Sequence, residues 1–72
     1  MKKFNQNMMV NKILSCRKEK GLTQAQLSEL TGINRTMIGR IENNDYIPTI
    51  EQLQTLGEIL NFDLTDFFQP DD

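Results

Sequence analysis

The chain has 72 residues, a formal net charge of −2, one cysteine and no histidine. This length suits one small domain with a modest core, one cysteine excludes an internal disulfide, and the lack of histidine makes a zinc site implausible. No apolar run approaches a membrane span and residues 1–12 lack the apolar stretch of a signal peptide, so we expect a cytoplasmic protein with no cofactor.

The chain is expected to begin as a loose arm. Residues 1–8 show no clear periodicity, so we predict a flexible segment there. Apolar residues then recur at helical spacing and predict a first helix over residues 9–20. Gly21 ends that helix, since a glycine commonly follows the last helical residue.

The second helix is predicted from a capping signal. Thr23 is a strong N-cap, and Gln26 three residues later completes a capping-box pattern. This helix is expected to bury Leu27 and Leu30 and to end at Gly32.

Two further helices are predicted downstream. The third begins at its N-cap, Asn34, and stops at the sequence NND. Pro48 prevents an immediate restart, and a fourth helix begins at Thr49. The fourth helix is expected to bury leucines at three- and four-residue spacing, namely Leu53, Leu56 and Leu60.

The chain is expected to close with a short turn of helix and a tail. Asp63 caps the sequence DLTDFF, which offers Leu64, Phe67 and Phe68 as possible dimer contacts. The two adjacent phenylalanines cannot point the same way, so one is expected to close the core. Residues 69–72 are predicted to be a frayed acidic tail. The sequence thus predicts an all-α domain of five short helices over residues 9–68, without strands.

The third helix has two chemically different sides. At about 100° per residue, one side gathers Arg35, Thr36, Gly39, Arg40 and Asn43. The other side is apolar and must pack on the domain; it consists of Met37, Ile38 and Ile41. The outer side therefore holds two arginines and no acid, whereas an ordinary solvated face would mix the signs of charge.

The second and third helices are joined only by the sequence TGIN. A short turn containing glycine is typical of the helix-turn-helix motif, whose second helix enters the major groove of DNA. Its N-terminal residues reach base edges, and here they are Arg35 and Thr36, which suit guanine and thymine respectively. Gly39 costs about 1 kcal/mol of helix propensity against alanine, so we hypothesise that it lets the backbone approach DNA closely.

Charge is distributed unevenly along the chain. Residues 1–44 carry all eight basic residues and three acids, whereas residues 45–72 carry seven acids and no base. This asymmetry favours a basic working end that binds DNA and an acidic far end.

The stretch GLTQAQLSELTGINRTMIGRIENN resembles the helix-turn-helix of the lambda-repressor/Cro-like family, also called the xenobiotic-response-element family. The resemblance covers residues 10–68. It implies a compact five-helix DNA-binding domain in which helices two and three form the motif. It further implies a transcriptional regulator, with repression favoured, that binds double-stranded DNA at a palindromic operator as a homodimer.

The resemblance also implies roles for single residues. Gln24 matches a position that holds the DNA backbone, and Arg17 and Glu42 match a structural ion pair between helices one and three. The full set of DNA-binding residues that we expect is Gln24, Asn34, Arg35, Thr36, Gly39, Arg40 and Asn43. Asn44 stands where the family often has glycine, and the loop after it carries Asp45 and no base, which weakens the expected grip on phosphates there.

Two alternatives remain open. The chain is also compatible with an antitoxin, or another regulator whose main partner is a protein such as a toxin, and the acidic C-terminal half would serve that role. A protein-interaction module that has lost DNA binding is the second alternative, against which the two arginines on the third helix argue. An enzyme is not expected, because the chain has no histidine and no phosphate-binding glycine loop.

Overall fold

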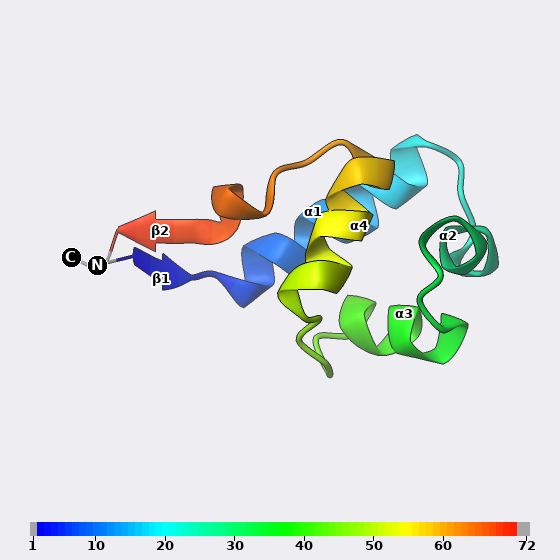
Figure 1. The fold of residues 1–72 in the computed structure, drawn as a ribbon, viewed down its shortest axis with the longest axis horizontal. Coiled ribbons are helices and arrows are strands. Elements are labelled where there is room, and N and C mark those ends of the chain that lie inside the picture. The colour runs from blue at the N-terminus through cyan, green and yellow to red at the C-terminus, as the bar shows by residue number, and fades with distance from the viewer. Residues whose placement is uncertain (1, 71–72) are drawn as a thin grey trace.

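The computed structural model describes residues 2–70, which form four α-helices, a 3-10 helix and a two-stranded antiparallel sheet (Figure 1). The elements in chain order are β1 Lys2–Phe4, α1 Gln6–Glu19, α2 Gln24–Thr31, α3 Arg35–Glu42, α4 Ile50–Leu60, the 3-10 helix η1 Leu64–Phe67 and β2 Phe68–Pro70. The sheet lies at one end of the long axis and α2 at the other (Figure 1). No helix within residues 2–70 is both long enough and apolar enough to cross a membrane.

Local sequence signals fix the starts of the three central helices. Thr23 and Thr49 each accept a hydrogen bond from the backbone N–H three residues later, and Gln26 and Gln52 complete the two capping boxes. Asn34 caps α3 by accepting a hydrogen bond from the backbone N–H of residue 36. The predicted starts of α2, α3 and α4 are therefore confirmed.

The two ends of the described chain differ from the prediction. β1 pairs antiparallel with β2, with Phe4 opposite Phe68, so the expectation of a chain without strands was wrong. Helix α1 begins at Gln6, capped by Asn5, so residues 2–8 form a strand and a first helical turn rather than a loose arm. Residues 69–70 belong to β2, while residues 1, 71 and 72 of the predicted arm and tail lie outside the described residues.

Contacts between the two chain ends explain this difference. The Phe4 ring lies edge-on to Phe67, with ring centroids 6.4 Å apart, and 5.4 Å from the Phe68 ring. The backbone N–H of Asn5 donates to the carbonyl of Phe67 at 2.7 Å. Such pairings join residues far apart in the sequence, so they leave no local periodicity from which a strand can be predicted.

The last helical turn is a 3-10 helix, so the described chain has four α-helices and not five. Asp63 caps it by accepting hydrogen bonds from the Thr65 backbone N–H and the Thr65 hydroxyl, at 3.0 and 2.8 Å. Both bonds favour the carboxylate and lower the pKa of Asp63 from its ordinary value. The fold is therefore mostly, but not entirely, helical.

One apolar core joins all the helices. Its buried members are Met9, Val10, Ile13, Leu27, Ile33, Ile38, Ile41, Leu53, Leu56, Leu60 and Phe67. The predicted burial of the three α4 leucines is confirmed, whereas Leu30 is 54% exposed and does not point inward as expected. Helix α2 instead turns the side that carries Leu27 and the half-buried Thr31 toward the core, which leaves Leu30 at the edge.

Candidate nucleic-acid interface

The turn between α2 and α3 is held by backbone conformation and side-chain hydrogen bonds. Gly32 adopts a left-handed conformation with φ of 75° and ends α2, and the next residue, Ile33, is buried. The Ser28 hydroxyl donates to the carbonyl of Ile33, and the Thr31 hydroxyl accepts from the Ile33 N–H. This turn is the short glycine-containing connection of a helix-turn-helix motif, and it places α3 along one edge of the molecule (Figure 1).

Helix α3 has the two sides that its sequence predicts. Ile38 and Ile41 are buried and Met37 is half-buried, so this side packs on the core. The polar residues expected to contact DNA are exposed, with Gly39 half-buried among them; they are Asn34, Arg35, Thr36, Arg40 and Asn43. The structure thus brings these six residues together on one outer side of the motif.

An ion pair connects α1 to the last turn of α3. The Arg17 guanidinium donates to both carboxylate oxygens of Glu42, at 2.6 and 2.9 Å, and also to the carbonyl of Leu22 at 2.8 Å. The two charged side chains are only 13% and 5% exposed. Gln24, at the start of α2, donates its amide to Glu42 Oε1 at 3.0 Å. Glu42 therefore binds α1 and α2 to α3 and fixes the direction of the Gln24 side chain.

Gly39 of α3 lies next to the end of the Gln24 side chain. A Cβ atom built on Gly39 would meet Gln24 Oε1 at 3.8 Å, which is an ordinary van der Waals contact. An alanine therefore fits at this position, whereas a longer side chain competes with the Gln24 amide for the same space. The close-approach hypothesis for Gly39 consequently applies to Gly39 and Gln24 together.

Two replacements of Gly39 distinguish its cost in helix propensity from its proposed role in letting the backbone approach DNA. Gly39→Ala is expected to stabilise the fold by up to about 1 kcal/mol, with operator affinity retained. Gly39→Gln is expected to displace the Gln24 amide and to lower operator affinity. Thermal unfolding and DNA titration of both variants check this; a Gly39→Gln variant that binds as well as the unchanged chain contradicts the close-approach account.

The Arg40 side chain turns toward the loop after α3. Its guanidinium lies 3.6 Å from the carboxylate of Asp45 and 5.9 Å from the centre of the Tyr46 ring. Both partners of the ion pair are largely exposed, so their attraction is worth at most about 1 kcal/mol. Arg40 can therefore exchange Asp45 for a phosphate at little cost. The α3 sequence alone does not reveal this acid, because the loop brings it beside the helix.

Two asparagines follow α3. Asn43 is its C-cap, and Asn44 has a left-handed backbone with φ of 62°. Asparagine tolerates this conformation better than most residues, which explains its presence where related sequences often have glycine. The side-chain amide of Asn44 donates to Asn7 Oδ1 at 3.3 Å, a link to α1 that the sequence did not indicate.

The expected dimer contacts have different surroundings. Phe67 is 1% exposed, so it closes the core and is not available to a partner, which corrects its place among the possible dimer contacts. Leu64 and Phe68 are half-buried. Two exposed isoleucines, which were not predicted as dimer contacts, lie before and at the start of α4. Ile47 is 54% exposed and Ile50 is 64% exposed. Within residues 2–70, no group of three or more carboxylate or thiol side chains is placed to hold a metal ion.

Comparison with known proteins places this sequence in a family. A sequence model described as helix-turn-helix matches residues 13–67. The transcriptional regulator SutR of Escherichia coli K12, described as HTH-type, is 33% identical over 54 residues, which are 75% of this chain and 30% of SutR. The ImmF control region 10 kDa protein of Bacillus phage phi105 is 38% identical over 48 residues, covering 67% of this chain and 53% of the phage protein.

A third relative is another HTH-type transcriptional regulator of Escherichia coli K12, PuuR. It is 35% identical over 52 residues, which are 72% of this chain and 28% of PuuR. The matched segment thus spans about half or less of the length of each of these relatives. Since the family model matches most of the chain and α2 and α3 meet through the glycine turn described above, the chain belongs to the Cro/C1-type helix-turn-helix family.

Proposed function

We propose that this chain is a cytoplasmic, sequence-specific double-stranded DNA-binding regulator of transcription that occupies a palindromic operator as a homodimer and represses transcription. The observation that carries the proposal is the outer side of α3, which exposes Arg35 and Thr36 next to the helix-turn-helix turn and Arg40 in its last turn, and which contains no acid of its own. Three relatives described as transcriptional regulators or as a control-region protein support it.

The proposed contacts divide into base reading and backbone anchoring. Arg35 and Thr36 stand in the first turn of α3, from which side chains reach base edges when the helix enters the major groove. Arg40 stands further along α3 and contacts a base edge or a phosphate once it leaves Asp45. Gln24 and Asn43 bind phosphate oxygens, and Glu42 holds the Gln24 amide in place for this contact.

The proposed homodimer suits the two-fold geometry of a palindromic operator. Dimers of this motif read two half-sites that lie about 34 Å apart, or a multiple of that distance. Leu64 and Phe68 remain the contacts that the sequence suggests, and the exposed Ile47 and Ile50 offer a second apolar surface nearer to α3. Alanine substitution of each pair, with sizing of the free protein and of the DNA complex, identifies which pair forms the interface.

Arg35→Ala tests the proposed base contact. The operator is first obtained by selecting bound sites from random DNA. The variant is expected to bind that operator more weakly by about 1–3 kcal/mol and to lose its preference at one base pair of each half-site. Lys20→Ala, which removes an exposed lysine outside the motif, is the matched control and is expected to keep the preference. An Arg35→Ala variant with an unchanged site preference contradicts the assignment.

A further inference from the structure

A stripe of polar side chains on α1 is not used by the interface described above. Asn7, Asn11 and Lys18 follow one another at helical spacing on α1 and are exposed, with the half-buried Leu14 between them. We call these three polar residues the α1 stripe. The one acid of α1, Glu19, follows Lys18 and so points about 100° away from it. The stripe therefore offers hydrogen-bond donors without an acid among them.

Two links hold the α1 stripe beside the C-terminal half of α3. At one end of the stripe, the Asn44 amide donates to Asn7 Oδ1 at 3.3 Å. At the other end, Arg17, the neighbour of Lys18, pairs with Glu42 in the last turn of α3. Both links end within residues 42–44, so they fix α1 against the C-terminal end of the helix proposed to enter the groove.

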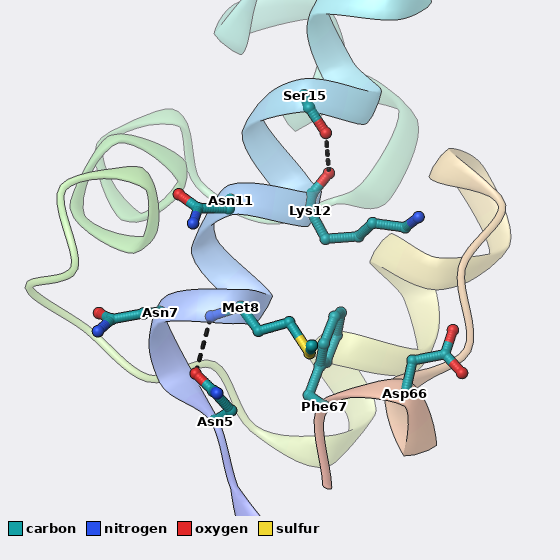
Figure 2. Close-up of a pocket in the computed structure, with 8 residues that line it drawn as sticks. All are labelled: Asn5, Asn7, Met8, Asn11, Lys12, Ser15, Asp66 and Phe67. Atoms are coloured by element: carbon teal, nitrogen blue, oxygen red, sulfur yellow. Dashed lines mark hydrogen bonds between the residues drawn. The ribbon is translucent and has the colours of Figure 1, made fainter. Parts of the chain in front are cut away.

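The side-chain directions place the amides on the α3 side of α1. Figure 2 shows Asn7 and Asn11 extending to the same side of α1, where the chain of α3 and its following loop passes. Lys12 and Asp66 extend to the other side, across the open cavity that these residues help to line (Figure 2). A molecule bound along α3 beyond Asn43 would therefore lie on the same side of α1 as these two amides.

The hydrogen bond from Asn44 also determines what Asn7 can bind. It occupies the carbonyl oxygen of the Asn7 amide, so the donating Nδ2 group remains for a further partner. Within residues 2–70, Asn11 makes no side-chain hydrogen bond that would hold its amide elsewhere. Amide N–H groups are common donors to the phosphate oxygens of DNA.

We propose that Asn7 and Asn11 bind phosphate oxygens of the operator strand that runs beside the C-terminal half of α3, with Lys18 attracting the same strand. This inference rests on the proposed function and adds α1 as a second clamp on the DNA backbone. The stripe is about 17 Å long at 1.5 Å per residue, so it runs past more than one phosphate. Asn44 acts as a positioning residue, because it orients the Asn7 amide.

Asn7→Asp and Asn11→Asp test the clamp with almost no change of side-chain shape. Each replaces two donors by a negative charge, and each is expected to lower operator affinity about tenfold or more at low salt. Gln54→Glu makes the same change of amide to carboxylate on an exposed residue of α4, outside the α1 stripe, and is the matched control, with a smaller loss expected. Affinities are measured by fluorescence anisotropy on the selected operator, and circular dichroism checks that each variant is folded.

Two further variants test the clamp, and the gain of affinity expected for the first is a readout that a folding defect does not imitate. Asn11→Lys is expected to raise operator affinity and to steepen the slope of log affinity against log salt by about 0.9, the value for one more neutralised phosphate. Asn44→Gly suits the left-handed backbone and removes the bond to Asn7, so a weaker operator complex is expected with the fold retained.

The outcomes separate this inference from the proposed function. If the unchanged chain binds the operator but Asn7→Asp and Asn11→Asp lose no more affinity than Gln54→Glu, the clamp is wrong and the proposed function stands. An Asn11→Lys variant with an unchanged salt slope also overturns the clamp. If the unchanged chain binds no DNA, the proposed function fails, and the clamp fails with it.

Discussion

Glu42→Leu is expected to lower the free energy of unfolding by about 3–5 kcal/mol, because it leaves the Arg17 guanidinium largely buried without its partner. The variant also takes away the acceptor of the Gln24 amide. For a domain of this size the loss is a large share of the total stability. Urea unfolding at low temperature, followed by circular dichroism, measures it.

The double variant Arg17→Met, Glu42→Leu is the control for this prediction. It replaces both charges by apolar side chains of similar length, and buried ion pairs exchanged in this way are often neutral in stability. We therefore expect the double variant to be more stable than Glu42→Leu alone. If the single and double variants lose equal stability, the pair does not carry the interaction that its two short hydrogen bonds indicate.

Phe67→Ala is expected to cost about 3–5 kcal/mol of stability, as is usual when a buried phenylalanine is removed. Its ring packs on Phe4 and Phe62, and both aromatic contacts are lost in the alanine variant. The loss is measured by urea unfolding, together with the oligomeric state at several protein concentrations.

Phe68→Ala is the matched control, because Phe68 is the same residue type next in the chain but is only half-buried. We expect a smaller loss of stability for it, and a weaker dimer if Phe68 is part of the interface. If Phe67→Ala unfolds like the unchanged chain while it weakens the dimer, Phe67 is an interface residue and its place in the core is wrong.

The features that are predictable from this sequence depend on residues close together in the chain. Capping boxes at Thr23 and Thr49 involve residues three apart, so they mark the helix starts correctly. The two sides of α3 follow from helical periodicity alone. The ion pair of Arg17 with Glu42 depends on the packing of two helices, and only resemblance to a family suggested it.

The features that were missed depend on packing between distant residues or on the path of a loop. The strands at the two ends are joined by aromatic contacts between Phe4 and residues 67–68, and neither strand shows a period of its own. The approach of Asp45 to Arg40 and of Asn44 to Asn7 follows from the path of one loop. These contacts determine how the candidate interface is oriented, although most of its residues are recognisable from the sequence.

The exposed side of α3 and its neighbours are proposed to bind DNA and to read its sequence. The most direct measurement is the affinity for the selected operator and for a shuffled duplex of the same composition, from 50 to 200 mM salt. We predict that both affinities fall steeply as salt rises, since phosphates are neutralised, and that the operator is bound on the order of 10³-fold or more tightly than the shuffled duplex. Affinity that is insensitive to salt, or equal for the two duplexes, would contradict the claim.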